Sequence, residues 1–394
     1  MLPILTIQKG KERAMFNRHP WIFSGAVAQI PKAENGDIVD IRTVEGNRIG
    51  YGFFSPDSQI ICRVFEYTDR VIDVKSSFYW KEKLGNALKL RKLLIQNTQT
   101  NSYRLIHAEG DFLPGLIADV YNQTIVLQFL IKGTEKLKPI IVDALGDLGF
   151  QYIFDKSKEI TERLEGIEGQ KGWLSEKKGQ EKIKILENGI KFWVDIMEGQ
   201  KTGFFLDQRD ARQLLEKYSQ NKKVLNTFCY SGGFSMYALR GGAKLVHSVD
   251  ASQPSLTICD ENVILNEFSS EKHQSICADC FDFLKDMKEN EYDIIILDPP
   301  AFAKHAKAVE NAAKGYKELN MKALKKIRSG GILFTFSCSQ KVDRDLFRKI
   351  VFSAAADSNR NVRILHQTTQ PADHPINIYH PENEYLKGLV LYVE

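Results

Sequence analysis

The N-terminal part of the chain alternates short apolar runs with polar turns. The runs cover residues 38–41, 48–51 and 59–65, and they are rich in β-branched and aromatic side chains. Runs of this length between turn residues predict strands, and three in close succession favour a small β-barrel. Residues 76–96 instead carry apolar side chains at helical spacing, which predicts an amphipathic helix.

A second region mixes strands and helices. Residues 112–121 and 124–129 predict two strands, a helix is predicted near 135–148, and further strands are expected up to residue 195. Residues 155–184 are rich in lysine, glutamate and glycine, which favours an exposed excursion. The region therefore predicts a central α+β module.

From about residue 221 the pattern changes to strands and helices in alternation. The expected strands are nearly continuous apolar runs at residues 224–225, 245–250, 293–297 and 331–336. This alternation is typical of a parallel sheet with helices on both faces. The C-terminal half therefore predicts a doubly wound α/β domain.

Polar side chains follow the expected strands of this domain. Ligands of such sheets bind beyond the carboxyl ends of the strands, so side chains located there are candidates for a binding site. The sequence places four of them at these ends: Asn226, Asp250, Asp298 and Cys338.

A loop with paired glycines follows the first strand of the domain. Gly232 and Gly233 let the backbone approach a ligand closely and lead into a helix whose N-terminal amides face the expected cleft. Their spacing is not the dinucleotide fingerprint, which disfavours a nicotinamide oxidoreductase. Asp250 follows about 20 residues later, where a carboxylate can accept hydrogen bonds from both ribose hydroxyls. Asp279 precedes a helix and could bind an exocyclic amine.

Composition narrows the class of protein. The chain has 394 residues with 43% hydrophobic and 26% charged side chains, which is typical of a globular protein of roughly two to four domains. Its formal charge of +4 permits a nucleic-acid partner without requiring one. Neither a secretory signal nor a bilayer-spanning run is apparent, so we expect a cytoplasmic protein without a membrane partner.

The cysteines do not suggest a disulfide framework or a metal site. Six of them are scattered over a long chain, which favours free thiols in a reducing compartment. Cys277 and Cys280 form a lone C-x-x-C pair without a second pair of ligands, so no metal is expected.

Longer motifs match one enzyme family. The matching segments are 9–13, 19–25, 201–209, 225–234, 297–300, 315–316, 334–339, 372–375 and 385–388. They resemble the bacterial ribosomal RNA large-subunit methyltransferase I family, whose members form 5-methylcytosine in 23S ribosomal RNA with S-adenosylmethionine. The resemblance implies a PUA domain at 1–72, a central strand-strand-helix-strand-strand module at 73–190 and a class I Rossmann-like methyltransferase domain at 191–394.

The resemblance also implies which residues bind the cofactor and the RNA. The implied cofactor-binding residues are Gln208, Phe228, Tyr230, Ser231, Gly232, Gly233, Asp250, Ser252, Asp279, Cys280 and Asp298. The RNA-binding candidates combine basic and aromatic side chains, which neutralise phosphates and stack on bases. They are Lys9, Lys11, Arg13, Arg18, Trp21, Lys201, Phe204, Phe205, Arg209 and Lys304. The expected partner is 23S ribosomal RNA, and the sequence leaves open whether the chain forms a homodimer.

Methylation at carbon 5 of cytosine sets a chemical requirement. Carbon 5 is not nucleophilic until another group adds to carbon 6, so the reaction needs covalent catalysis. A thiolate suits that task, and the strand-end Cys338 is the expected nucleophile. Asp298 is expected to stabilise the negative charge that grows on N3 and O2 of the base. Ala301 stands where the family has lysine, and no residue is assigned to removal of the carbon 5 proton.

Two other functions stay open at this point. An Asp-Pro-Pro motif followed by an aromatic residue also serves methylation of base nitrogens, although Phe302 lies one position late and Cys338 would then have no purpose. A non-catalytic RNA-binding or ribosome-assembly factor could also retain this fold. Measurable cofactor affinity would discriminate against that last alternative.

Overall fold

The computed structural model divides the chain into two compact units. It describes residues 1–95, 99–157, 171–303 and 308–394. The first unit comprises residues 1–186, 194–206 and 372–383. The second comprises residues 187–193, 207–371 and 384–394. The boundaries near residues 72 and 190, which separate the three domains expected from the sequence, stay a prediction.

The N-terminal part of the first unit is a six-stranded sheet with the order β2-β6-β5-β4-β1-β3. Its strands are β1 (Ile4–Ile7), β2 (Trp21–Phe23), β3 (Val27–Gln29), β4 (Ile38–Thr43), β5 (Arg48–Phe54) and β6 (Ile60–Tyr67), and α1 (Arg13–Phe16) precedes β2. The three runs predicted as strands are β4, β5 and β6, so that prediction is confirmed. The sheet's edge strands, β2 and β3, are joined by a single 3-10 turn over Ser24–Ala26.

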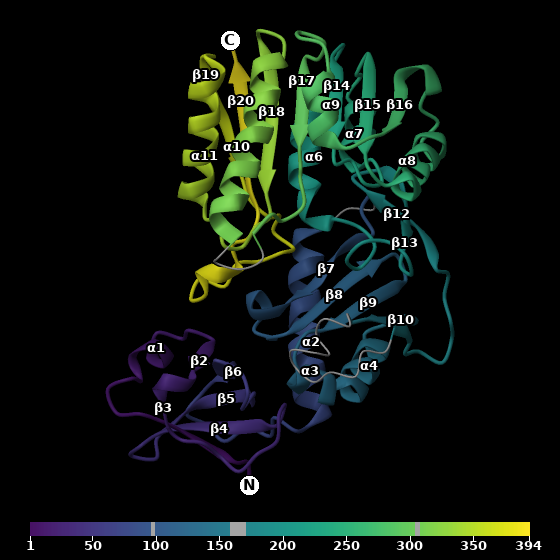
Figure 1. The fold of residues 1–394 in the computed structure, drawn as a ribbon. Helices are drawn as coiled ribbons and strands as arrows, with labels where there is room; N and C mark the ends of the chain where they lie inside the picture. Colours follow the sequence, from purple (N-terminus) through teal and green to yellow (C-terminus); the bar gives the residue numbers. More distant parts are fainter. Residues whose placement is uncertain (96–98, 158–170, 304–307) are drawn as a thin grey trace. The chain divides into compact units, whose positions relative to one another are not determined.

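A five-stranded sheet forms the central part of the first unit, with the order β11-β10-β9-β8-β7 (Figure 1). The strands are β7 (Ser102–His107), β8 (Leu116–Tyr121), β9 (Thr124–Phe129), β10 (Tyr152–Lys156) and β11 (Lys171–Trp173). Its helices are α2 (Ser77–Leu94), α3 (Lys132–Lys136) and α4 (Lys138–Asp147). The single helix predicted near 135–148 is therefore two helices, because Pro139 lies in the first turn of α4, where its missing amide hydrogen is tolerated.

The amphipathic helix predicted at 76–96 is confirmed as α2. Ser76 caps it by accepting a hydrogen bond from the amide of Phe78. Trp80 is buried in a cluster that includes side chains of β8, β9 and α4. Its ring also lies 6.0 Å from that of Phe53 and 5.1 Å from that of Phe65, measured between centroids. The N-terminal sheet and the central module therefore share one hydrophobic core.

Two segments from later in the chain join the first unit through buried polar contacts. The carboxylate of Asp119 is fully buried and accepts hydrogen bonds from Arg104 at 2.8 Å and from the Thr202 hydroxyl at 2.6 Å. The amide of Arg104 also donates to the carboxylate of Asp373 at 3.0 Å. These contacts explain why residues 194–206 and 372–383 fold with the first unit.

The second unit is built on a seven-stranded sheet with the order β16-β15-β14-β17-β18-β20-β19 (Figure 1). Its strands are β14 (Lys223–Thr227), β15 (Leu245–Asp250), β16 (His273–Cys277), β17 (Ile294–Leu297), β18 (Gly331–Ser337), β19 (Val362–Thr368) and β20 (Lys387–Val393). The predicted α/β class is confirmed, but β20 runs antiparallel to both neighbours. The reason is that no crossover helix separates β19 from β20, so the chain re-enters the sheet from the end at which it left.

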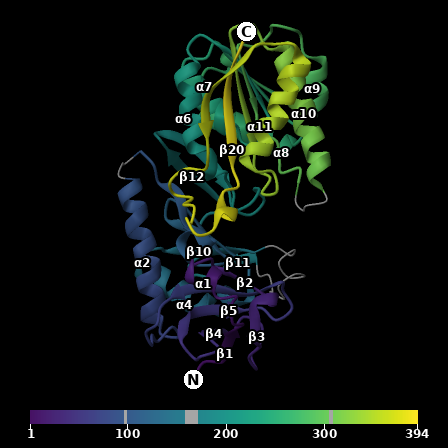
Figure 2. The same ribbon diagram turned by 90° about the vertical axis from the view of Figure 1, so that its left-hand side faces the viewer.

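Helices cover both faces of this sheet. They are α6 (Arg209–Tyr218), α7 (Gly233–Arg240), α8 (Gln253–Leu265), α9 (Cys280–Asp286), α10 (Val309–Lys326) and α11 (Arg344–Ser358). Figure 2 shows α6 and α7 on one face and α9, α10 and α11 on the other. A two-stranded hairpin, β12 (Lys182–Glu187) with β13 (Ile190–Asp195), precedes the sheet. Among the described residues, no helix has the length and apolar character required to span a membrane.

Candidate active site

Asp298 and Cys338 lie at the same rim of the second unit. Asp298 directly follows β17, and Cys338 directly follows β18. These strands are parallel neighbours in which Leu297 lies opposite Thr335. The sulfur of Cys338 is 3.9 Å from the carbonyl oxygen of Pro299. The two residues predicted to act in catalysis are therefore brought together.

The environment of Asp298 favours its protonated form. Burial, together with the nearby Asp207 carboxylate, raises the pKa of Asp298 to about 7. The side-chain amide of Gln208 donates a hydrogen bond to Asp298 at 3.0 Å, which opposes part of that shift. Near neutral pH a large fraction of Asp298 therefore carries a proton that it can donate.

The turn that carries Cys338 is fixed by three other elements. The hydroxyl of Ser339 accepts a hydrogen bond from the amide of Ala303 at 3.1 Å and is hydrogen-bonded to the Tyr316 hydroxyl of α10 at 2.9 Å. The backbone carbonyl oxygen of Ser339 accepts a hydrogen bond from the ammonium group of Lys387, on β20, at 2.7 Å. These contacts hold the backbone next to the thiol in one conformation.

Lys387 places a cation near Cys338. Burial lowers the pKa of Lys387 to about 8, and the nearby Cys338 acts in the opposite direction by favouring the charged ammonium form. Sequence reasoning included Lys387 only within a matching motif and gave it no role. The antiparallel direction of β20, which brings Lys387 opposite Ser337, could not be inferred from the apolar pattern.

The glycine-containing loop after β14 has an unusual backbone. Phe228, Tyr230 and Gly232 have positive φ values of 53°, 48° and 78°, in the left-handed region. Only glycine adopts this region without cost, and strained non-glycine residues cluster at binding sites. The amide of Cys229 donates to the carbonyl of Val249 at 3.1 Å, which ties the strained loop to β15.

Asp250 anchors the other side of this loop. Its carboxylate accepts hydrogen bonds from the amides of Tyr230 and Ser252, each at 2.9 Å. The side chain is half-exposed, and a carboxylate has further lone pairs beyond those two bonds. Asp250 is thus oriented by the loop and can still accept hydrogen bonds from the hydroxyls of a ligand.

The two candidates after β16 have mainly structural contacts. Asp279 caps α9 by accepting hydrogen bonds from the amides of Phe281 and Asp282 at 2.8 and 3.1 Å. The Cys280 sulfur accepts from the amide of Phe228 at 3.2 Å, and burial raises the pKa of this thiol to about 12. Cys280 therefore supports the glycine loop as a neutral thiol, while the exposed Asp279 can reach a ligand.

A buried ion pair lies beneath the glycine loop. The carboxylate of Glu187 is fully buried and accepts two hydrogen bonds from Arg212, at 2.9 and 2.8 Å, and one from Tyr237 at 3.0 Å. A Cβ atom added to Gly233 would lie 3.1 Å from the Arg212 guanidinium. Sequence reasoning missed this support, because Glu187 belongs to β12 and no local pattern links it to the loop.

Unsatisfied polar atoms mark where a polar ligand would bind. The Ser231 hydroxyl, in the glycine loop, and the Gln208 side-chain oxygen, beside Asp298, are buried without a hydrogen-bond partner among the described residues. Such atoms are costly unless a ligand or water satisfies them. Asn226 does not lie at the rim as expected, because it is within β14 and is buried against Ser235, to which its amide donates at 2.9 Å.

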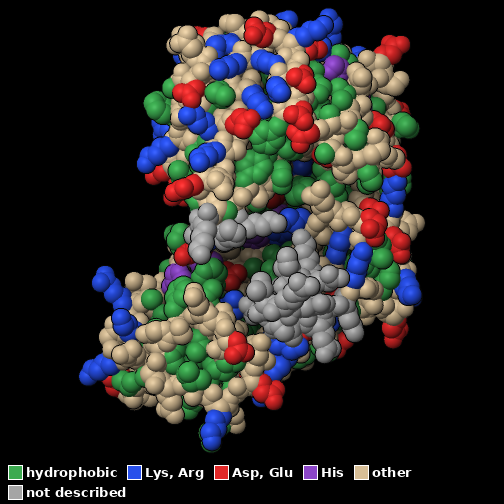
Figure 3. Space-filling model, viewed as in Figure 1, with side chains coloured by type: hydrophobic (Ala, Val, Ile, Leu, Met, Phe, Trp, Pro, Cys, Tyr) green, Lys and Arg blue, Asp and Glu red, His purple; other side chains and the backbone are tan. Residues whose placement is uncertain are grey.

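The basic candidates in the N-terminal sheet region are exposed to solvent. They are Lys9, Lys11, Arg13 and Arg18. Figure 3 shows lysine and arginine side chains projecting at separate points around this part of the molecule. Trp21 is half-buried, and its indole N–H donates to Glu109 at 2.8 Å. The charged groups are therefore available to phosphates, whereas the indole nitrogen is already paired.

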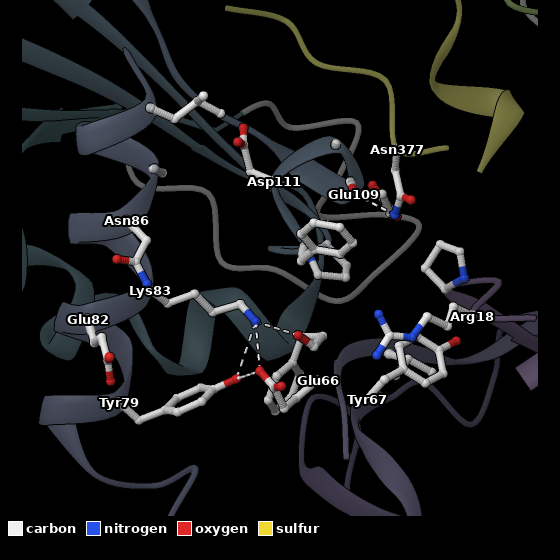
Figure 4. A pocket seen from close by; sticks show the side chains of 18 residues that line it. Arg18, Glu66, Tyr67, Tyr79, Glu82, Lys83, Asn86, Glu109, Asp111 and Asn377 are labelled. Carbon is white, nitrogen blue, oxygen red and sulfur yellow. Dashed lines mark hydrogen bonds and ion pairs between the residues drawn. The ribbon is translucent and has the colours of Figure 1, made fainter. Parts of the chain in front are cut away.

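A cavity of about 500 Å³ lies in the first unit next to Arg18 (Figure 4). Lys83 of α2 reaches toward Glu66 and Tyr79 and is hydrogen-bonded to both, at 3.2 and 3.3 Å. The Arg18 guanidinium instead lies about 6 Å from the ring centroids of Tyr67 and Tyr379. Of these two cations, Arg18 is the one placed to meet a phosphate, because the Lys83 charge is balanced internally.

The remaining RNA-binding candidates differ in exposure. Lys201 is exposed and Phe205 is half-buried, whereas Phe204 is buried and its backbone bonds to the Tyr121 hydroxyl. Arg209 is buried 3.4 Å from the Glu187 carboxylate. Lys304 lies outside the described residues. We therefore retain only Lys201 and Phe205 from this group as surface candidates.

Comparison with known proteins gives consistent matches. Residues 163–375 match the S-adenosylmethionine-dependent methyltransferase family, and residues 5–67 match the PUA-like domain. Proteins named ribosomal RNA large subunit methyltransferase I from Aliivibrio fischeri and Escherichia coli are 41% and 40% identical, over 97% and 98% of both chains respectively. The protein of that name from Photobacterium profundum is 39% identical over all of both chains.

Solved structures share the fold over the whole chain. A Streptococcus mutans protein assigned as a SAM-dependent methyltransferase is 22% identical, with a TM-score of 0.84 over 100% of both chains. A protein assigned as a methyltransferase and crystallised with SAH is 23% identical, with a TM-score of 0.86 and the same coverage. Because relatives about 40% identical cover almost the whole chain, and the catalytic family covers more than half of it, the chain belongs to the ribosomal RNA large subunit methyltransferase I family of S-adenosylmethionine-dependent methyltransferases.

Proposed function

We propose that this chain forms 5-methylcytosine in 23S ribosomal RNA through a covalent bond between Cys338 and carbon 6 of the base. The observation that carries the proposal is the position of Cys338 at the rim. Its sulfur lies 3.9 Å from the carbonyl oxygen of Pro299, the residue that follows Asp298. Methylation of a base nitrogen requires no thiol, because the nitrogen already has a lone pair. A cysteine held beside the Asp-Pro-Pro motif therefore favours carbon methylation.

The Cys338 thiolate begins the reaction by adding to carbon 6. This step forms a carbon–sulfur bond and moves electron density onto carbon 5 and N3. When bound, S-adenosylmethionine would supply an electrophilic methyl group to carbon 5 and would leave as S-adenosylhomocysteine. Loss of the carbon 5 proton then restores the double bond, and the carbon–sulfur bond breaks to release the Cys338 thiolate. We assign no residue to the acceptance of that proton.

Asp298 acts on the opposite edge of the base. Addition at carbon 6 places negative charge on N3 and O2, and a protonated carboxyl group can donate a hydrogen bond to that charge. The raised pKa of Asp298, about 7, keeps such a proton available near neutral pH. Gln208 orients the carboxyl group through its 3.0 Å hydrogen bond.

Lys387 positions and stabilises the nucleophile. Its ammonium group binds the Ser339 carbonyl next to Cys338, and a nearby cation favours the thiolate over the neutral thiol. The hydrogen bond between Tyr316 and Ser339 fixes the same turn from α10. The sulfur therefore has both a fixed position and a favourable charge environment.

The glycine loop and Asp250 are the proposed cofactor-binding elements. Asp250 would accept hydrogen bonds from the ribose hydroxyls, and the unsatisfied hydroxyl of Ser231 would gain a hydrogen-bond partner. The left-handed residues 228, 230 and 232 give the loop the conformation that would surround the cofactor. Asp279 and Gln208 flank the site and would bind through the exposed carboxylate and the unsatisfied amide oxygen.

The first prediction concerns the cofactor. Replacing Asp250 with alanine in the full chain should weaken S-adenosylmethionine binding about tenfold to a hundredfold, because a charge-assisted pair of hydrogen bonds contributes about 1.5–3 kcal/mol. Titration calorimetry measures the change. Asp286→Ala removes an exposed carboxylate of α9 and is the matched control. Equal affinity in both variants would contradict the assignment of Asp250.

The second prediction concerns RNA binding. Arg18→Gln should weaken binding of a 23S ribosomal RNA fragment and reduce the slope of log affinity against log salt by about 1, because one phosphate contact is lost. Lys32→Gln removes another exposed cation of the same region and should leave the slope unchanged. Identical slopes for both variants would remove Arg18 from the interface.

The third prediction concerns the nucleophile. Cys338→Ala should abolish methyl transfer while leaving cofactor affinity nearly unchanged, and Cys338→Ser should behave similarly, since a hydroxyl is far less available as an anion. RNA that carries 5-fluorocytosine should remain covalently attached to the wild-type protein, because fluorine cannot leave as a proton does. The Cys277→Ala variant, which removes an exposed cysteine, should still form this adduct.

These outcomes separate the candidate functions. Methyl transfer without an adduct indicates methylation of a nitrogen, and the absence of both indicates an RNA-binding factor. Normal turnover by Cys338→Ala would overturn the covalent mechanism.

The fourth prediction concerns pH. If Asp298 acts in its protonated form, kcat should fall as pH rises through about 7, because the protonated fraction falls there. Asn is a permanent hydrogen-bond donor, so Asp298→Asn should have a lower kcat at pH 6 but should lack this decline. Rate profiles between pH 6 and 9 at saturating substrates test the point. A decline that persists unchanged in Asp298→Asn would assign it to another group.

A further inference from the structure

Two histidines and a glutamate from distant parts of the sequence meet in the first unit. They are His19, which precedes β2, and His380 and Glu382, which belong to the segment 372–383. One potential ligand atom from each residue lies within 4.8 Å of the other two. The Nε2 atoms of His19 and His380 are 3.7 and 3.4 Å from the same carboxylate oxygen of Glu382.

His380 presents an unsatisfied nitrogen to this cluster. Its side chain is 2% exposed, and its Nε2 atom forms no hydrogen bond with any described atom. Its Nδ1 atom lies 2.7 Å from the side-chain oxygen of Asn383. An amide oxygen can only accept, so Nδ1 carries the hydrogen, and Nε2, which faces the Glu382 carboxylate, has a lone pair for a metal ion when the ring is neutral. A buried imidazole with a free lone pair is costly unless something binds it.

The surroundings hold both rings in orientations that suit a metal ligand. The ring of Trp21 packs on that of His380 with centroids 4.3 Å apart. The Nδ1 atom of His19 lies 3.2 Å from the amide nitrogen of Trp21 and 3.3 Å from its carbonyl oxygen, and zinc at Nε2 would select the tautomer in which Nδ1 donates to that carbonyl. Histidine ligands of metals commonly have such a partner on the second ring nitrogen.

We propose that His19, His380 and Glu382 bind a single zinc ion. Zinc lies about 2.0–2.2 Å from nitrogen and oxygen ligands, so ligand atoms at tetrahedral angles are about 3.3 Å apart. The separations of 3.4 and 3.7 Å from Glu382 are close to this value, and the three ligand atoms, which lie within 4.8 Å of one another, would have to draw together around the ion. Two imidazoles with one carboxylate suit zinc, whereas magnesium and calcium take oxygen ligands.

The proposed ion would have a structural role. His19 leads into the N-terminal sheet, and His380 and Glu382 are separated from it by more than 350 residues of sequence. A shared ion would fasten the segment 372–383 to β2 inside the first unit. Glu382 and His19 are partly exposed, which leaves room for water in the fourth coordination position.

The test uses the full chain, freed of metal with a chelator and then titrated with zinc chloride. We expect about one zinc per chain by calorimetry and elemental analysis, and a zinc-dependent rise in the melting temperature. His19→Gln and Glu382→Gln should each lower zinc affinity at least tenfold. Both positions are partly exposed, so these variants are expected to fold even if His380→Asn does not.

A neighbouring carboxylate provides the matched control. Glu384 lies two residues beyond Glu382 but pairs with Arg344, so Glu384→Gln should keep the zinc affinity of the original chain. Absence of bound zinc in the original chain would overturn the proposal. Equal zinc affinity in Glu382→Gln, His19→Gln and Glu384→Gln would also overturn it, since it would place the ion elsewhere, for example on cysteines.

Discussion

The buried carboxylate of Glu187 is the constraint on which the second unit depends. A fully buried charge is tolerated only when it is paired and hydrogen-bonded, and removing one partner costs several kcal/mol. Arg212 of α6 and Tyr237 of α7 meet that requirement, so both helices are fixed to the end of β12. Gly233 packs directly against Arg212, and Gln208 reaches Asp298 from the residue before α6. The proposed cofactor loop and the proposed acid are therefore positioned by the same ion pair.

The proposed chemistry requires a protonated carboxyl group and a thiolate at the same pH. The rim provides opposite surroundings for the two groups. Asp298 lies near another carboxylate, Asp207, which disfavours its charge, whereas Cys338 lies near the ammonium group of Lys387. Because the two environments differ, one group can be protonated and the other ionised at the same pH, so each can take its own role in the reaction. The arrangement depends on the direction of β20. Lys387 is the first residue of this strand, and in a parallel strand the first residue would lie at the opposite end of the sheet from the rim.

Local signals explain what the sequence could predict. The strands β17 and β18 are nearly continuous apolar runs, and Asp298 and Cys338 follow their ends directly, so their meeting at one rim follows from the parallel arrangement. The direction of β20 and the roles of Glu187 and Lys387 depend on pairings across long stretches of sequence. The cluster of His19 with His380 has the same origin, since nothing near either histidine indicates the other. Asn226 does not lie at the rim because β14 extends through Thr227, so this side chain is inside the strand and is buried against Ser235 of α7.

The division of the chain into two units has a consequence for how either unit can be inherited or synthesised. The chain passes from one unit to the other five times, after residues 186, 193, 206, 371 and 383. Neither unit is therefore encoded by one uninterrupted stretch of gene, and a single recombination point would divide at least one of them. The first unit is also completed late during translation, because its last segment emerges only after most of the catalytic sheet has been made. Exchange of one unit between relatives would require three segments to be moved together.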